Sequence, residues 1–301
     1  MPSARAVEFR GDVSGEWSAA LNPVVLSADC RVPAGTMLQV GPGTRVLLAP
    51  GASLVVEGTL TATGSESQPV SFLAAAPLTG PWRCIEVTPT GSASLTHCDV
   101  RGGGAALATE LSGALCVRGG RLTLIDSSLS GSQSNGIYAA SGAVRIAGCR
   151  FLNNGGERPT DAALHIVSSQ VLLGASSAAT SVEGSPFGIY NENLAPVDAA
   201  GLWWGSATGP QHASNLAGQG VSVSDDVLYS DFQNHSPVLV LGDVDADGLR
   251  DMRDVAALTR LAAGMTAASP EQIFTGDLVT DGALDLRDAV ALARIVLAPG
   301  P

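Results

Sequence analysis

The chain of 301 residues carries a formal net charge of −12 and contains 36 glycines, whereas aromatic residues make up only 4% of it. This acidic balance argues against a nucleic acid as partner. The absence of any run of about 18 uninterrupted apolar residues argues against a membrane-spanning helix. The abundance of small, β-branched and glycine residues favours short strands joined by tight turns over a helical bundle.

The stretch from Val24 to Phe232 consists of short apolar segments interrupted by Gly, Pro, Ser and Asn. Four fragments within it align with one another and begin about 25 residues apart, a spacing typical of a solenoid repeat. They are ALCV from Ala114, GIYA from Gly136, ALHI from Ala163 and GIYN from Gly188. A β-sandwich would have regular turns without this self-similarity. The repeats therefore predict a parallel β-solenoid in which each coil stacks on the last.

The second positions of the four fragments are Cys116, Tyr138, His165 and Tyr190. Their neighbours are apolar and are expected to point into the core, so these four should form an outward ladder with one step of about 4.8 Å per coil. Tyr138, His165 and Tyr190 are therefore candidate glycan-binding residues whose rings could stack on sugars. The alternative is ordinary side-chain stacking on a solenoid face, or cover by a loop.

Two longer motifs resemble the right-handed parallel β-helix repeat proteins that share the pectin-lyase-like fold. They are VPAGTMLQVGPGTRVLLAPGASLVVEGTLTATG near the N-terminus and GLWWGSATGP from Gly201, which looks like a last-coil cap. The resemblance implies a mainly β fold, a right-handed parallel β-helix, over residues 1–232. From Leu241 onward the pattern changes to acidic loops followed by apolar stretches at helical spacing, which predicts a linker over residues 233–240 and a separate small α-helical domain over residues 241–301.

Many β-helix proteins are polysaccharide lyases or glycoside hydrolases acting on pectin-like or other plant and microbial glycans. Catalysis of either kind needs clustered carboxylates, and the aligned coils show no column of Asp or Glu. The motifs typical of polygalacturonases are also absent. We therefore assign no catalytic residue and favour a non-catalytic polysaccharide-binding solenoid, with a lyase or hydrolase, or a purely structural surface protein, as alternatives.

The five cysteines are odd in number and have no CxxC spacing, which disfavours a zinc site or a dense disulfide framework. Buried single thiols are expected instead. The cysteines are Cys30, Cys84, Cys98, Cys116 and Cys149.

The segment DVDADGLRDMRD from Asp243 to Asp254 has the spacing of a calcium loop, with Gly248 at position 6. Calcium takes six to eight oxygen ligands, and this spacing brings carboxylates round one ion while glycine makes the sharp turn. The expected ligands at positions 1, 3, 5, 9 and 12, with a backbone carbonyl at position 7, are Asp243, Asp245, Asp247, Asp251, Asp254 and Leu249.

A second loop, DLVTDGALDLRD, begins at Asp277 and repeats the pattern. Its expected ligands are Asp277, Asp281, Asp285 and Asp288, with the carbonyl of Ala283. Position 3 is Val279, which has no side-chain oxygen, so we expect the second site to bind Ca²⁺ more weakly than the first. Two such loops in tandem are a far more specific signal than one.

A helix with an apolar stripe is expected after each loop, formed by Val255, Leu258 and Leu261 in one and by Ala289, Leu292 and Ile295 in the other. The duplicated loop–helix unit resembles a type I dockerin, a module that docks onto a cohesin domain through either of two related helix faces. The resemblance implies partner-binding positions at Met252, Arg253 and Arg260 in the first repeat and at Leu286, Arg287 and Arg294 in the second.

The resemblance also implies a secreted or cell-surface protein that belongs to a larger assembly. The first residues, MPSARAVEFRGDVSG, lack the apolar core of a signal peptide. We therefore expect an export signal to be missing from this sequence.

Overall fold

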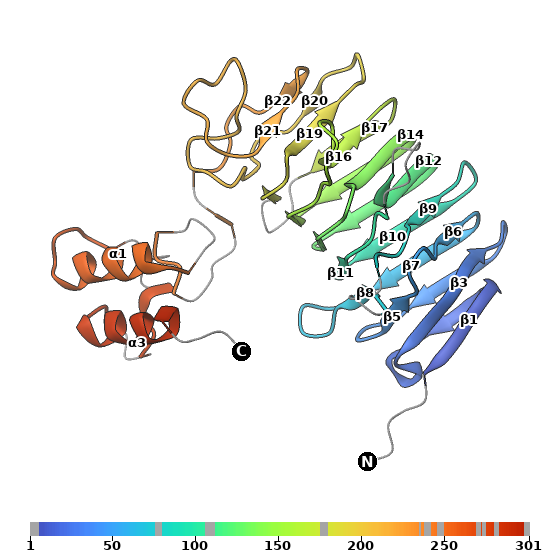
Figure 1. Ribbon diagram of the computed structural model, residues 1–301, viewed down its shortest axis with the longest axis horizontal. Helices are drawn as coiled ribbons and strands as arrows, with labels where there is room; N and C mark the ends of the chain where they lie inside the picture. Colours follow the sequence, from blue (N-terminus) through green and yellow to red (C-terminus); the bar gives the residue numbers. More distant parts are fainter. Residues whose placement is uncertain are drawn as a thin grey trace.

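The computed structural model describes residues 6–75, 80–105, 112–174, 180–234, 236–237, 242–245, 250–268, 272, 275–279 and 283–297. Most of these residues form a parallel β-solenoid whose strands stack in chain order along one axis (Figure 1). All pairings between named strands in the described part of the chain are parallel, for example β7 with β10 and β10 with β12. The mainly β, parallel solenoid predicted from the repeats is therefore confirmed, whereas its right-handed sense stays a prediction.

The strand pairings define three faces that run along the solenoid, and several long strands turn a corner from one face to the next. The first face contains β1 (Val7–Asp12), β3 (Val24–Val32), β6 (Leu54–Val56), β9 (Ile85–Val87), β12 (Gly113–Ile125), β14 (Asn135–Ala147), β16 (Ala162–Ile166), β19 (Phe187–Asn191) and β21 (Ser222–Val223).

The second face contains β2 (Gly15–Trp17), β4 (Met37–Val40), β7 (Thr59–Thr63), β10 (Ser92–Thr96), the later parts of β12 and β14, and β17 (Gln170–Gly174). The third face contains the first residues of β1 and β3 together with β5 (Arg45–Leu48), β8 (Val70–Ala74), β11 (Cys98–Arg101), β13 (Ser128–Ser130), β15 (Arg150–Leu152) and β18 (Ser181–Glu183). Outside these faces lie a 3₁₀ turn (Ala19–Leu21) and a two-stranded sheet of β20 (Val197–Asp198) and β22 (Val227–Leu228).

The core is built from inward residues that stack in register from coil to coil. On the second face Leu60 pairs with Ala93, Ala93 with Leu122, and Leu122 with Val144. All four are buried. Alternate residues of a strand point to opposite faces of a sheet, so a repeat of apolar residues at matching positions fills the interior coil by coil.

A column of glycines occupies the corner between the first and second faces. It consists of Gly58, Gly91, Gly120 and Gly142. A Cβ placed on Gly91 would lie 1.9 Å from the carbonyl oxygen of Val56 in the coil below, and the other three glycines meet a backbone oxygen at 2.3 Å. Only glycine lets the backbones of successive coils approach this closely.

The described cysteine thiols are all buried and free, as expected from their spacing. Burial raises the pKa of Cys98 and of Cys149 to about 12 and that of Cys30 to about 11. A thiol that is protonated and shielded from solvent does not act as a nucleophile.

We therefore expect an aromatic disulfide reagent to label almost no thiol in the folded protein at about pH 8, and all five after unfolding in guanidinium. The colour released by the reagent measures the number of accessible thiols. Rapid labelling of the native protein would contradict the buried assignment.

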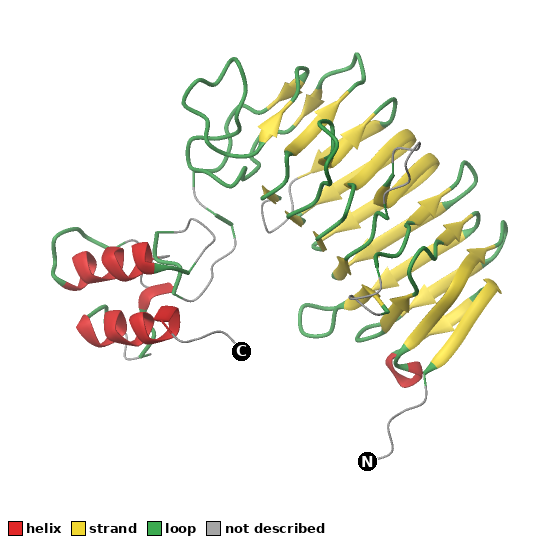
Figure 2. Ribbon diagram, in the orientation of Figure 1, coloured by secondary structure: helices red, strands yellow, loops and turns green. Residues whose placement is uncertain are grey.

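The described residues after the solenoid include two named helices, α1 (Met252–Ala262) and α3 (Leu286–Leu297), which are among the segments coloured red in Figure 2. They share a small hydrophobic cluster that is distinct from the solenoid core. No helix in the described part of the chain is both long enough and apolar enough to cross a membrane.

The apolar stripes of the two helices were predicted correctly in α1 but only in part in α3. Leu258 is buried, and Val255 and Leu261 pack against the same cluster. In α3, Ala289 and Leu292 are buried, but the predicted third member, Ile295, is largely exposed and Val296 packs instead. Residues 289, 292 and 296 are three and four positions apart and stay on one side of a helix of 3.6 residues per turn.

Candidate functional site

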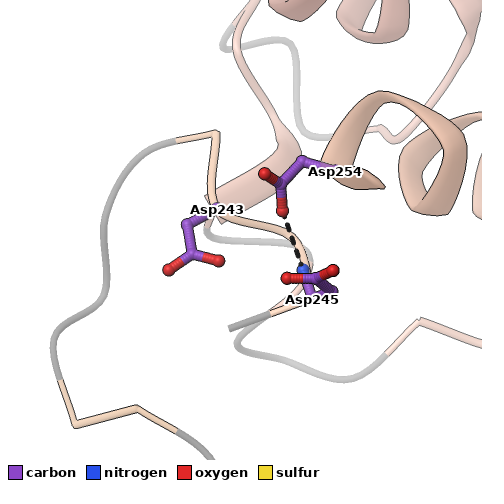
Figure 3. Close-up of side chains that lie close together, drawn as sticks. All are labelled: Asp243, Asp245 and Asp254. Carbon is purple, nitrogen blue, oxygen red and sulfur yellow. Dashed lines mark hydrogen bonds between the residues drawn. The ribbon is translucent and has the colours of Figure 1, made fainter. Parts of the chain in front are cut away.

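Three carboxylates of the first loop converge on one point. Asp243, Asp245 and Asp254 each offer an oxygen, and these oxygens all lie within 4.8 Å of one another. Figure 3 shows Asp254 at the start of α1 facing the turn that carries Asp243 and Asp245. Asp243 and Asp254 are buried, so their negative charges repel one another in surroundings that screen them poorly. A hard divalent cation between them would remove this repulsion.

The Asp254 carboxylate also organises the backbone of the loop. One oxygen accepts hydrogen bonds from the N–H groups of Val244 (2.7 Å) and Asp245 (3.1 Å), and the other accepts from Asp251 (2.8 Å). Asp251 is the N-cap of α1 and accepts from the N–H of Arg253 at 2.7 Å. Asp251 and Asp254 thus form a capping box that starts the helix and folds the loop back onto it.

The second loop has the same hydrogen-bond pattern at the matching residues. Asp288 is fully buried, and its carboxylate accepts from the N–H of Val279 (2.9 Å) and of Asp285 (3.0 Å). Asp285 accepts from the N–H of Arg287 at 2.7 Å, as Asp251 does from that of Arg253. The sequence repeat is therefore also a repeat of local structure.

The structure brings together three of the predicted metal ligands of the first loop, Asp243, Asp245 and Asp254. Asp251 lies beside them as the helix cap. In the second loop Asp277 and Asp285 are half-buried, Ala283 is exposed, and Val279 occupies position 3 with its side chain largely exposed. Three predicted ligands, Asp247, Leu249 and Asp281, lie outside the described residues.

The six predicted partner-binding residues are all exposed on α1 and α3. They are Met252, Arg253, Arg260, Leu286, Arg287 and Arg294. Arg287 forms an ion pair with Asp285 at 2.7 Å, and this guanidinium lowers the pKa of the Asp285 carboxyl below its ordinary value. Arg253 lies 4.0 Å from Asp251 in the matching place.

The aligned residues of the first face form the ladder that the fragments predicted, but its expected exposure is wrong. Cys116 pairs with Tyr138, Tyr138 with His165, and His165 with Tyr190. Tyr138 is only 8% exposed and His165 is fully buried, while Tyr190 is half-buried. The rings meet edge to face, with centroids 5.4 Å and 5.1 Å apart.

Two residues of this strip, Cys116 and Tyr138, belong to a second, smaller hydrophobic cluster that is separate from the solenoid core. Cys116 and Tyr138 pack there with Cys84, and the Arg118 guanidinium lies 5.6 Å from the centroid of the Tyr138 ring. The burial of these rings favours the alternative of stacking on a solenoid face over an open platform for sugar rings.

His165 makes stability depend on pH. Burial lowers the pKa of its imidazole below the ordinary value of about 6.5, although a contact of 3.1 Å between Nε2 and Oε1 of Glu192 opposes the shift. The unfolded chain takes up this proton near pH 6.5 and the folded chain only at a lower pH, so stability is lost as the pH falls through that window.

We expect the melting temperature to fall between about pH 7.5 and about pH 5, and to fall less in His165→Gln. Thermal scans of both proteins at the two pH values measure this difference. An identical pH dependence in the two proteins would show that His165 does not carry the effect.

A hollow with a volume of about 630 Å³ lies on the third face beside the end of the solenoid, and we call it the terminal hollow. Arg150, Glu183 and Trp204 contribute to its wall, and Gln211 and Gln219 to its lining. Of these residues, only Trp204 belongs to a motif that the sequence offers, the predicted last-coil cap GLWWGSATGP. Arg150 and Glu183 occupy outward positions on paired strands, but that signal became visible only with the strand register.

A scan against protein-family models and searches of curated proteins and of solved structures found no match for this chain.

Proposed function

We propose that residues 241–301 form a calcium-dependent docking module of the dockerin type, which attaches the β-solenoid to a cohesin-type partner. The observation that carries the proposal is the repeated hydrogen-bond pattern of the two loops. In each, a fully buried aspartate at position 12 accepts from the backbone N–H groups of positions 3 and 9. Two equivalent loops, each leading into a helix, are the architecture of paired calcium-binding units.

The chemistry of the first loop supports Ca²⁺ as the ion. Its converging donors are all carboxylate oxygens, which hard cations prefer, and no Cys or His contributes to the group. Asp243, Asp245 and Asp254 would hold the ion, with Asp247 and the carbonyl of Leu249 as further predicted ligands. A bound ion would neutralise the negative charges of these carboxylates. The loop would then hold α1 in a fixed orientation relative to the loop. The second loop, with Val279 in place of a carboxylate, would bind more weakly.

The exposed residues of the two helices supply a docking surface that occurs twice. Arg253 and Arg287 each sit next to the aspartate of position 9, which restricts where the guanidinium can lie. Large exposed apolar side chains, Met252 and Leu286, precede them. An arginine beside an apolar residue is a common composition for the centre of a protein interface.

In this proposal the protein acts outside the cytoplasm, and the solenoid presents a polysaccharide-binding surface while the docking module holds it in an assembly. A lyase or hydrolase activity is the alternative for the solenoid. New reducing ends or unsaturated uronides after incubation with a polysaccharide panel would favour that alternative.

The docking proposal is tested by binding of the full chain to a panel of immobilised type I cohesin domains. We expect binding in calcium and none in excess chelator. Because the surface occurs twice, Arg253→Glu and Arg287→Glu should each retain binding, whereas the double variant should lose it. Arg45→Glu, on the solenoid, is the matched control. Absence of binding to every cohesin in calcium, or binding that survives in the double variant, would contradict the proposed docking surface.

A further inference from the structure

The terminal hollow continues along the third face into a second concavity. This lateral hollow has a volume of about 350 Å³, and its lining includes Glu66, Asp99, Arg101 and Asp126. Arg150 lines both hollows, so they adjoin at its side chain. Together they extend over several coils, which is a shape suited to an elongated ligand rather than a compact one.

Two residues that line the terminal hollow, Arg150 and Trp204, have hydrogen-bond donors that the described part of the protein does not use. The Nε of Arg150 and the indole Nε1 of Trp204 are buried and have no hydrogen-bond partner within the described part of the chain. The Arg150 Nε lies 3.9 Å from Oε1 of Glu183, which is too long for a hydrogen bond. Buried polar groups are normally satisfied, so an unused donor at a hollow points to a ligand or water that completes it.

A ligand hydroxyl group that approaches from the hollow would meet Arg150 and Glu183 side by side, because both residues line it. It would accept from the guanidinium and donate to the carboxylate, two charge-assisted hydrogen bonds made by a single oxygen. Glu183 is only 9% exposed, and a charged group that is largely withdrawn from water forms stronger hydrogen bonds than an exposed one.

Two glutamines that line the terminal hollow, Gln211 and Gln219, can also both donate and accept hydrogen bonds. The backbone of Gln211 is fixed by hydrogen bonds to Val221 and from Val223, and that of Gln219 by a bond to the Thr208 hydroxyl. Both residues are exposed on a held backbone. A side-chain amide both donates and accepts, and it therefore matches the hydroxyl groups of a polyol.

The charges of the two hollows select against an acidic ligand. Their linings contain four carboxylates, those of Glu66, Asp99, Asp126 and Glu183, against two guanidinium groups, those of Arg101 and Arg150. Arg101 is already paired with Asp99 at 2.7 Å. A uronate chain would meet net negative charge along its length, whereas a neutral chain of hydroxyl groups would not.

We propose that the terminal and lateral hollows form one groove that binds a neutral oligosaccharide along the third face, with Arg150 and Glu183 clamping a hydroxyl group. The inference rests on the proposed role of the solenoid as a polysaccharide-binding surface and is independent of calcium and of the docking module.

Calorimetric titration of the full chain with cellohexaose, mannohexaose and hexagalacturonate, in calcium and in chelator, tests the groove. We expect at least one neutral hexasaccharide to bind equally in both buffers and more tightly than hexagalacturonate. Arg150→Gln and Glu183→Gln should each raise the Kd by about tenfold or more. The double variant Gln211→Ala/Gln219→Ala changes only exposed side chains and should weaken binding without affecting folding. Arg45→Gln, an arginine of the same face outside both hollows, should bind like the unmodified chain.

The outcomes distinguish failure of the proposed groove from failure of the proposed carbohydrate-binding role of the solenoid. Oligosaccharide binding that none of these variants weakens would overturn the groove while leaving the solenoid as a carbohydrate-binding surface. Tighter binding of hexagalacturonate would overturn the neutral class. No binding of any of the three would overturn both the groove and the proposed role of the solenoid.

Discussion

Replacing Asp254 by alanine is expected to unfold α1 and α3 while leaving the solenoid intact. The substitution removes a buried carboxylate that accepts from three backbone N–H groups, and it removes one of three converging carboxylates that we propose as calcium ligands. Each buried donor left without a partner costs about 1–3 kcal/mol. The cluster that joins the two helices is small, and a segment of about sixty residues has only a few kcal/mol of stability to lose.

Hydrogen–deuterium exchange of the full chain measures this effect in each segment separately. Peptides from α1 and α3 should be protected in calcium in the unmodified chain and should exchange rapidly in Asp254→Ala, with solenoid peptides unchanged. Asp245→Ala is the matched control, because Asp245 belongs to the same carboxylate group but is exposed. It should weaken calcium binding and keep the helices protected at saturating calcium. Helices that stay protected in Asp254→Ala would contradict the role assigned to this carboxylate.

Gly91→Ala is expected to destabilise the solenoid strongly, because the added methyl group would lie 1.9 Å from the carbonyl oxygen of Val56. That oxygen belongs to the backbone of the adjacent coil and cannot move without shifting the strand pairing. Overpacking typically costs about 1–3 kcal/mol, and a clash with a backbone oxygen belongs at the upper end of this range, about 3 kcal/mol. For a solenoid of this size, the melting temperature should fall by at least about 6 °C.

Gly41→Ala provides the comparison for this glycine, since its added methyl would meet the carbonyl oxygen of Trp17 at an ordinary 3.7 Å. Neither glycine has a positive φ, so the two substitutions differ mainly in the available space. Thermal scans should place Gly41→Ala close to the unmodified chain. Equal melting temperatures for the two variants would refute the steric account of the glycine column.

The register of the solenoid could be predicted from sequence because equivalent residues of successive coils become neighbours in space. The alignment of Cys116, Tyr138, His165 and Tyr190 is the pairing that the structure contains. Their burial could not be predicted in this way. Alternation of apolar residues shows which side chains point away from the core, but it does not show whether these side chains pack against one another, as Cys84, Cys116 and Tyr138 do, or face solvent.

The two candidate sites differ in how much of each can be predicted from the sequence. The predicted ligands of the first loop lie within twelve consecutive residues, so their spacing alone predicts that they converge, and three of the carboxylates do. The proposed groove depends on Arg150, Glu183, Trp204 and two glutamines, which are distant in sequence and line one hollow only because the coils stack. In α3 the sequence predicted that Ile295 belongs to the apolar stripe, but Val296 packs there instead. The packing of the partner helix decides which of two adjacent apolar residues is buried, and the sequence pattern of one helix does not contain this information.

Calorimetric titration of calcium into the full chain, after removal of divalent ions with a chelator, tests the central claim most directly. We predict one dominant site with a Kd below about 10 μM, and protection of α1 and α3 from hydrogen exchange that appears only as this site fills. A chain that binds no calcium, or whose helices are fully protected in chelator, would contradict a calcium-dependent docking module.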